Sequence, residues 1–286
     1  MVTRCMSLSC YRKIGACTEE DMTQTKRKKT DYIIQSVDHS LDVLEAFHGE
    51  EDELGITELS RRLKLHKNNI FRILATLEHR GYIEQNPATD NYRLGLGTLE
   101  LGQTYIRHTG LLRIARPVME ELNKKVNENV YIGILKDRYA FYLDVVESNH
   151  TVRVLSRVGC RVPTYCAAIG KAQLAYETPE TITEILGKKE LKKFTPGTIS
   201  DREKIIEHLA LVKELGYAVD DEEWDEGVRC VGAPIFDYTR KAVGAISISA
   251  PSVRMSMDQV KKEYVPLIKK ACEEISNRLG YDARED

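Results

Sequence analysis

The 286-residue sequence lacks a long apolar run. No stretch approaches the roughly 20 consecutive apolar residues with which a helix crosses a bilayer. The N-terminal segment also lacks the apolar core of a secretory signal peptide, because Arg4, Arg12 and Lys13 interrupt it. These absences argue against a membrane protein and against secretion. A cytoplasmic location with no membrane partner is therefore expected.

The seven cysteines lack the spacing of a metal site. None belongs to a C-x-x-C pair, so the usual zinc patterns are absent and neither a metal nor another cofactor is expected. In a reducing compartment the expected state is the free thiol. The first three cysteines could still bind metal or sense oxidants. Cys160, Cys166 and Cys230 could serve a redox enzyme, but no His or Asp stands at a spacing that would lower a thiol pKa.

The chain is close to neutral and long enough for two domains. Its formal net charge is −2, with 42% hydrophobic and 30% charged residues, as is ordinary for a globular protein. Residues 1–30 are polar, charged and without periodicity, which predicts a disordered tail. The basic run at residues 26–29 could contact phosphates or simply be solvated. Translation that begins at Met22 is a further possibility for this segment.

The stretch from Ile56 to Gly81, ITELSRRLKLHKNNIFRILATLEHRG, predicts two short amphipathic helices. Apolar residues three and four positions apart give each helix one stripe for burial. The stripes consist of Ile56, Leu59 and Leu63 in the first helix and of Ile70, Ile73, Leu74 and Leu77 in the second. The opposite face of the second helix is polar, as in a helix-turn-helix that enters the major groove of DNA. The alternative is a plain helical hairpin whose polar face is only solvated.

Charge and the following hairpin favour DNA binding. Between Arg61 and Arg80 the chain has six Lys or Arg residues against one acid, Glu78, so the basic excess is local. The next segment, GYIEQNPATDNYRLG, alternates apolar and polar residues around a turn, which predicts a β-hairpin. Helix, helix and hairpin in this order predict a winged helix-turn-helix domain over residues 31–95.

Asn pairs well with adenine and Arg with guanine, so polar residues of the second helix are expected at base edges. Arg61 and Arg93 are expected to hold phosphates. The predicted DNA-binding residues are Arg61, His66, Lys67, Asn68, Asn69, Arg72, Thr76 and Arg93.

The rest of the chain predicts a linker helix over residues 96–112 and then a mixed domain over 113–286. Strands are expected at residues 130–136, 139–147, 151–159, 229–237 and 242–250. Helices are expected at residues 169–176, 202–215 and 257–279. One antiparallel sheet with helices on its faces makes this an α+β domain. The acidic run from Asp220 to Glu223 is expected to form a solvated loop, with cation binding as the alternative.

These segments resemble the IclR family of bacterial transcriptional regulators over roughly Ile34 to Leu279. The N-terminal likeness lies in SVDHSLDVLEAF, ITELSRRLKLHKNNIFRILATLEHRGYI and NYRLGLGTLELG. The more specific C-terminal likeness lies in AAIGKAQLA, GYAVDDEEWDEGVRCVGAPIFD and AISISAP. The resemblance implies a GAF-like effector-binding domain behind the winged helix, a small-molecule effector, and homodimers that often pair into dimers of dimers on DNA.

The resemblance also implies an effector pocket, which corresponds here to Thr151, Val154, Ala168, Ile169, Asp220, Val228, Cys230, Ser247 and Ser249. The alternation of Ser247 and Ser249 with isoleucines places both hydroxyls on one side of a strand. Buried hydroxyls require partners, and a ligand carboxylate with two oxygens would provide them. Hydrogen bonds to neighbouring backbone are the alternative.

This sequence departs from the commonest family pattern near the helix that begins after Cys166. Cys166, Ala167 and Ala168 stand where Ser, Thr or Gly is frequent in the family, and Ala250 stands where Gly is frequent. More methyl groups at the entrance of this helix favour a more apolar ligand, such as an aromatic acid.

Together these features predict a transcriptional regulator and no enzyme. A dimer would read two half-sites of double-stranded operator DNA, and an organic acid would shift it between arrangements that match or mismatch their spacing. Two alternatives stay open: a cysteine-dependent redox enzyme or sensor built on the GAF-like domain, and an architectural DNA binder with no ligand.

Overall fold

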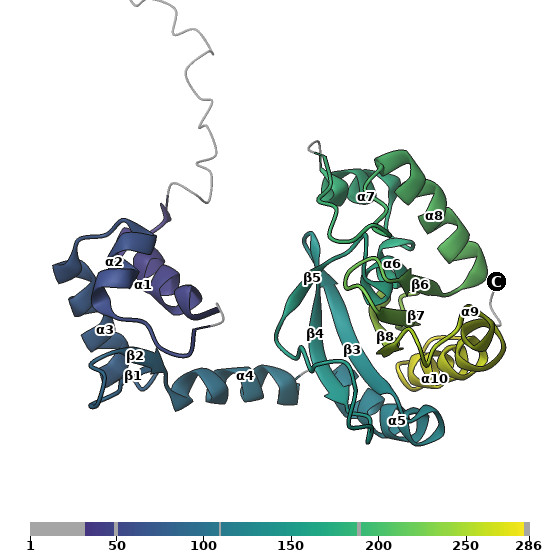
Figure 1. Ribbon diagram of the computed structural model, residues 1–286, viewed down its shortest axis with the longest axis horizontal. Coiled ribbons are helices and arrows are strands. Elements are labelled where there is room, and N and C mark those ends of the chain that lie inside the picture. Colours follow the sequence, from purple (N-terminus) through teal and green to yellow (C-terminus); the bar gives the residue numbers. More distant parts are fainter. Residues whose placement is uncertain (1–31, 49–50, 109, 188–189, 283–286) are drawn as a thin grey trace, which may run out of the picture. The chain divides into compact units, whose positions relative to one another are not determined.

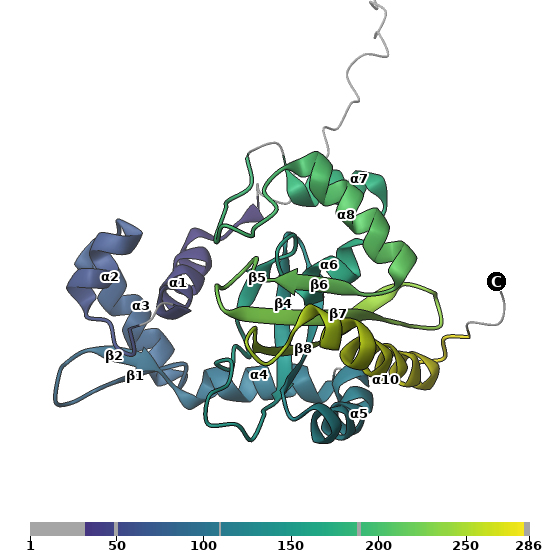
Figure 2. The same ribbon diagram turned by 45° about the vertical axis from the view of Figure 1, so that its right-hand side comes forward.

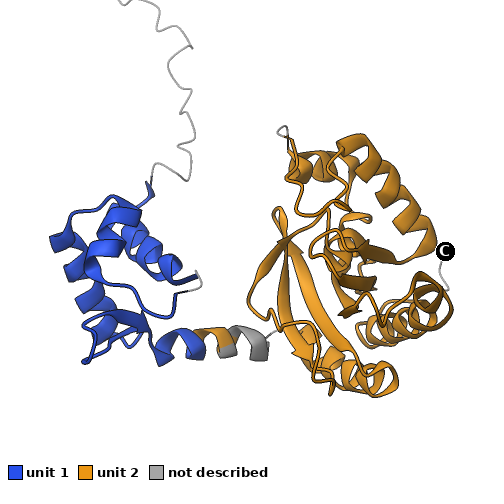
Figure 3. Cartoon of the chain, viewed as in Figure 1, with its two compact units in different colours: residues 1–100 blue, residues 101–286 orange. Residues whose placement is uncertain are grey.

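The computed structural model describes residues 32–48, 51–108, 110–187 and 190–282. The predicted disordered tail and the alternative start at Met22 lie outside this part of the chain. The chain divides into two compact units, residues 1–100 and 101–286 (Figure 3). No helix within the described ranges is long and apolar enough to cross a membrane.

The first unit consists of short helices followed by a two-stranded hairpin (Figure 1). Its elements are α1 (Gln35–Glu45), the 3-10 turn η2 (Ala46–His48), α2 (Ile56–Leu63), α3 (Lys67–His79), β1 (Ile83–Gln85) and β2 (Tyr92–Leu94). Leu59, Ile70 and Leu74 are fully buried in its core, together with Ile83 and Tyr92 of the hairpin. The predicted helix pair, the wing and their order are thus confirmed.

Local signals set the turn between α2 and α3. Lys64 ends α2 in the left-handed conformation, with φ at 54°. His66 caps α3, because its side chain accepts a hydrogen bond from the Asn68 amide. The wing is antiparallel, with Ile83 opposite Leu94 and Gln85 opposite Tyr92.

The second unit is built on a six-stranded sheet with the order β5-β4-β3-β8-β7-β6, and every pair is antiparallel. The helix α4 (Leu96–His108) precedes it. The strands are β3 (Asn129–Lys136), β4 (Tyr139–Val146), β5 (Arg161–Pro163), β6 (Ala218–Asp221), β7 (Val228–Phe236) and β8 (Ala242–Pro251). The helical elements are α5 (Gly110–Val126), α6 (Ala168–Leu174), α7 (Pro179–Leu186), α8 (Arg202–Leu215), α9 (Met257–Gln259), the π-helical turn η3 (Val260–Tyr264) and α10 (Val265–Arg278).

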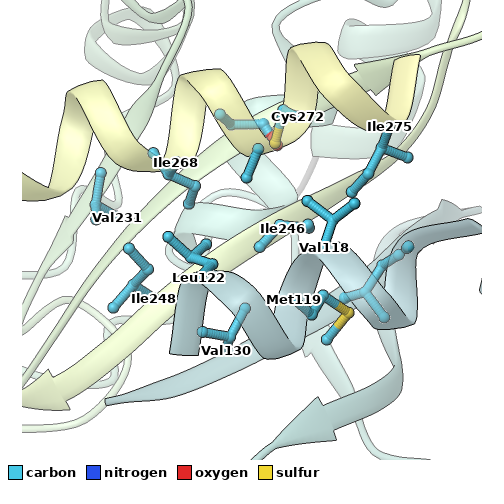
Figure 4. Packing of buried hydrophobic residues seen from close by; sticks show 14 of the residues in the cluster. Val118, Met119, Leu122, Val130, Val231, Ile246, Ile248, Ile268, Cys272 and Ile275 are labelled. Carbon is cyan, nitrogen blue, oxygen red and sulfur yellow. The ribbon is translucent and has the colours of Figure 1, made fainter. Parts of the chain in front are cut away.

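Helices cover both faces of this sheet (Figure 2). On one face α5 and α10 pack against apolar residues of β3, β7 and β8, with Met119, Ile246 and Ile268 fully buried (Figure 4). On the other face α6 and α8 pack over a second cluster that includes Tyr131, Ile169 and Leu209. The α+β class expected from the sequence is therefore confirmed.

Three expected elements differ from the structure. Residues 151–159 form no strand; side chains of β3 hold their carbonyl groups instead, since Asn129 donates to Val154 and Tyr131 to Leu155. The acidic run begins inside β6 and is not a solvated loop, because Asp220 and Glu223 are buried. The last helix contains the π turn η3, which precedes Pro266, a residue that cannot donate a backbone hydrogen bond.

Candidate functional sites: a recognition helix and a buried polar sheet face

The polar face of α3 is open to solvent. Lys67, Asn68, Asn69, Arg72 and Thr76 are all exposed, while the opposite stripe of the helix lies in the core. Arg72 forms no ion pair among the described residues, so its guanidinium is available to a partner. The Thr76 hydroxyl donates to the Arg72 carbonyl at 2.8 Å, which orients it along the helix.

His66 has a structural role that the sequence did not reveal. Its Nδ1 accepts a hydrogen bond from the Asn68 amide at 3.3 Å and so caps the first turn of α3. The cap places the exposed imidazole beside the predicted base-reading residues.

Two predicted phosphate contacts are ion-paired with acids. Arg61 donates to Glu58 through Nη2 at 2.6 Å, and Arg93 donates to Glu84 through Nε at 2.6 Å. The basic excess counted along the sequence from Arg61 to Arg80 missed both acids, because they lie outside that interval. Exposed ion pairs of this kind contribute little to stability, so a phosphate can replace either carboxylate.

Phe71 is a surface residue that the sequence pattern missed. Its side chain is 53% exposed, and it lies on the outward side of α3 next to Arg72 and one turn after Asn68. A large exposed apolar group on a polar helix face can contact the methyl group of thymine. The sequence signal that could have identified Phe71 is its position outside the apolar stripe of α3.

The second site is a row of polar side chains across the sheet. Strand register places Asp220 opposite Cys230, Cys230 opposite Ser249, and Ser249 opposite Asn129. The next row on the same face joins Ser247 to Tyr131. All of these residues are buried. The sequence predicted Asp220, Cys230 and both serines, and the fold adds Asn129 and Tyr131.

The start of α6 covers this face. A Cβ atom at Gly232, which pairs with Ser247, would lie 3.0 Å from the backbone carbonyl of Ala168, so a larger residue would require the start of α6 to shift by a few tenths of an ångström. Ala168 and Ile169, two of the predicted effector-binding residues, are buried there. The N-cap residue Ala167 provides no side-chain hydrogen bond to the first turn.

The remaining predicted effector residues lie at the margin of the buried polar row or outside it. Val154 is half-buried, and its carbonyl accepts from the Asn129 amide at 2.8 Å. Val228 is half-buried at the start of β7. The Thr151 side chain is exposed, so the structure does not bring it together with the buried row.

The serine hydroxyls are not used by the backbone. Within the described residues, neither Ser247 nor Ser249 donates to a backbone carbonyl, while Ser249 makes a side-chain hydrogen bond with Cys230. The alternative that both serines bond only to neighbouring backbone therefore loses its support.

Charged groups beside this face are buried and coupled. Burial raises the pKa of Asp220 to about 7, although Lys171 opposes the shift. The Lys171 ammonium donates to Glu223 and, at 2.5 Å, to the Val219 carbonyl. The second carboxylate oxygen of Glu223 is buried with no partner in the described residues. Burial also lowers the pKa of the neighbouring His208 to about 4, so its ring is neutral at physiological pH.

The buried thiols of Cys166 and Cys230 do not have the character of redox nucleophiles. Burial raises the pKa of Cys166 and of Cys230 well above the ordinary value for a thiol, and Asp220 adds to both shifts. A reactive cysteine requires the opposite shift. The described residues contain no cluster of three or more His, Cys, Asp or Glu side chains that could hold a metal ion.

An exposed recognition helix with a wing, carried by a chain that also has a buried polar site, defines a DNA-binding transcriptional regulator rather than an enzyme. Family models agree: residues 36–87 match the IclR helix-turn-helix domain, and residues 103–277 match the C-terminal domain of bacterial transcriptional regulators of the IclR type. The chain belongs to the IclR family.

Similar proteins are regulators of the same family. The chain is 37% identical to the HTH-type transcriptional regulator KdgR of Dickeya chrysanthemi over 248 residues, which cover 87% of this chain and 81% of that protein. The crystal structure of Thermotoga maritima IclR has a TM-score of 0.70 and 28% identity, covering 86% of this chain and 99% of that one. An IclR homologue from Microbacterium hydrocarbonoxydans, solved with 4-hydroxybenzoate, has the same fold, with a TM-score of 0.75 and 24% identity over 86% of this chain and 99% of that one.

Proposed function

We propose that α3 reads operator DNA through Asn68, Asn69 and Arg72 at base edges, with Lys67 and Phe71 beside them. The supporting observation is the exposed face of α3, whose polar residues are not used by the core. His66 and Thr76 lie at its edges. Arg61 and Arg93 exchange their carboxylate partners for phosphates and set the register.

Arg72→Ala is expected to weaken binding to a selected operator by about 1–3 kcal/mol, with a smaller loss on unrelated DNA, because the variant loses a base contact. Arg93→Ala is the matched control, since it removes a phosphate contact and weakens both kinds of DNA alike. Fluorescence anisotropy with an operator selected from a random pool measures both. Equal losses in the two variants would overturn these roles.

We further propose that a small organic acid, with an aromatic acid preferred, binds over the buried polar row. Its carboxylate takes hydrogen bonds from Ser247 and Ser249, with Asp220 and Cys230 beside them. Ala168 and Ile169 cover the apolar part of the ligand, and Thr151, Val154 and Val228 line the margin. The bound 4-hydroxybenzoate of the Microbacterium homologue is consistent with this class of ligand.

Calorimetric titration with benzoates and with small oxo-acids tests the effector class. The methyl groups of Ala167, Ala168 and Ile169 favour an aromatic ring, so tighter binding of benzoates is expected. Ser247→Ala should weaken binding about fivefold or more, because it removes one hydrogen bond to a charged group. Tighter binding of small oxo-acids would refute the aromatic preference, and no binding by any acid would favour the ligand-free architectural role.

The proposed assembly is a homodimer or a dimer of dimers, with residues 31–95 as the DNA-binding domain, 96–112 as the linker and 113–286 as the effector domain. Exposed apolar residues at the N-cap and on the surface of α1, and on α4, support an interface with a second copy: Ile34, Val37, Leu41, Leu96, Leu99 and Leu101. Effector binding shifts the dimer between arrangements with different affinity for the paired half-sites. The cytoplasm, where DNA is accessible, is the proposed location.

A further inference from the structure

The segment at residues 148–155 is held to strand β3 by two side chains that lie next to the serines of the proposed effector site. Asn129 Nδ2 donates to the Val154 carbonyl at 2.8 Å, and Tyr131 Oη donates to the Leu155 carbonyl at 2.9 Å. Asn129 Oδ1 also accepts from the Ser148 amide at 2.8 Å. The side chains of Val152 and Leu155 are 69% and 78% exposed, so the segment has little apolar packing of its own at these two positions.

The two residues that hold the segment, Asn129 and Tyr131, are called the anchors, and each lies opposite one of the two serines in the strand register. Asn129 lies opposite Ser249 and Tyr131 lies opposite Ser247. Residues paired in this way on one face of a sheet have Cβ atoms about 4.5–5.5 Å apart. Any group bound by the serines is therefore next to both anchors.

The anchors have no spare hydrogen to give. Both hydrogens of the Asn129 amide are used, one by Val154 and one by the Tyr131 oxygen at 3.1 Å. The single hydroxyl hydrogen of Tyr131 is used by Leu155. A ligand held by the serines fills the face beneath the segment and keeps water away from these bonds, which strengthens them.

We propose that Asn129 and Tyr131 are positioning residues through which occupancy of the Ser247 and Ser249 row fixes the segment 148–155. This inference rests on the proposed effector site. It explains why a fully buried asparagine and a buried tyrosine hydroxyl donate to the backbone of a segment with several exposed side chains, Thr151, Val152, Arg153 and Leu155. The segment thereby becomes the first part of the domain to respond to the ligand.

Limited trypsin proteolysis of the full chain tests the anchoring without a ligand. Cleavage after Arg153 requires the segment to detach from Asn129 and Tyr131. The cleavage rate therefore follows the population of the form in which the segment is detached. Tyr131→Phe removes the hydrogen bond to the Leu155 carbonyl and also the acceptor of one Asn129 hydrogen, and it should raise this rate about fivefold or more. Tyr142→Phe is the matched control, because its ring lies 5.0 Å from that of Tyr131 but its hydroxyl donates to no carbonyl of the segment among the described residues.

The expected pattern is faster cleavage after Arg153 in Tyr131→Phe and an unchanged rate in Tyr142→Phe. Equal rates in the wild type and Tyr131→Phe would overturn the proposal.

In a second arm, saturating benzoate or pyruvate should protect Arg153 in the wild type, and the protection should shrink at least threefold in Tyr131→Phe. Undiminished protection would also overturn it. Failure of both acids to shift the wild-type thermal midpoint would count against the effector proposal instead, and the ligand-free arm would still decide the anchoring.

Discussion

Lys171→Met is expected to destabilise the second unit by about 3–5 kcal/mol, because it leaves the carboxylate of Glu223 buried without its cation. Lys171 has no exposed side-chain surface, and Glu223 is 5% exposed. The pair joins α6 to the segment that follows β6, and the Val219 carbonyl accepts a second hydrogen bond from the same ammonium. Urea denaturation followed by circular dichroism measures the loss.

Two further variants separate the effect of the buried charge from that of the side-chain volume. Lys171→Met combined with Glu223→Leu removes both charges and should recover most of the lost stability, since buried ion pairs can often be replaced by apolar residues. Lys124→Met is the matched control, because Lys124 forms an exposed ion pair with Glu121 at 2.8 Å, and little change is expected there. A double variant as unstable as the single one would show that lost packing, and not an unpaired carboxylate, is responsible.

Asp220→Asn is expected to stabilise the protein relative to the wild type increasingly as the pH rises from 5 to 7. Burial raises the pKa of Asp220 from 3.8 to about 7, so the folded state favours the protonated form. The stabilising contribution of that proton is fully present below the unfolded pKa and is lost as the pH rises through the folded pKa. The difference should grow by about 1.4 kcal/mol per pH unit and level off above pH 7.

Thermal and urea unfolding of both proteins between pH 5 and 8.5 measures this difference. The side-chain carbonyl oxygen of the Asp220→Asn variant can still accept the Glu223 amide hydrogen bond, which Asp220 accepts at 2.8 Å, so the comparison isolates the ionisation. A stability difference that is constant from pH 5 to pH 8 would show that Asp220 is ionised throughout.

The same ionisation bears on the effector, because a protonated Asp220 can donate to a ligand carboxylate whereas an ionised one repels it. The affinity for benzoate should therefore fall above pH 7 in the wild type and not in Asp220→Asn.

The DNA-binding unit could be predicted almost completely from the sequence. Its helices are amphipathic, and contacts between residues close in the chain define it, although the His66 cap on α3 was not predicted. The effector site was predictable only in part. Ser247 and Ser249 came from the strand alternation and the family resemblance, but nothing in the local pattern identified Asn129 and Tyr131 as their register neighbours, or Lys171 as the partner of Glu223.

Errors in the sequence prediction have a common physical origin. The stretch TVRVLSRVG alternates like a strand, but the edge of β4 pairs with residues 161–163 instead, and side-chain hydrogen bonds hold residues 154 and 155. The acidic run suggested solvation because carboxylates are usually exposed. Its burial depends on Lys171, a residue about fifty positions earlier that no local pattern connects with it.

By itself the sequence determined the fold class, the helix pair with its wing, and the family, because periodicity and charge act between residues a few positions apart. Only the tertiary structure decided that Glu84 pairs with Arg93, which polar residues share a row with the two serines, and which carboxylate has its pKa raised towards neutrality. Those properties depend on strand register and burial, which are set by contacts between residues distant in the chain.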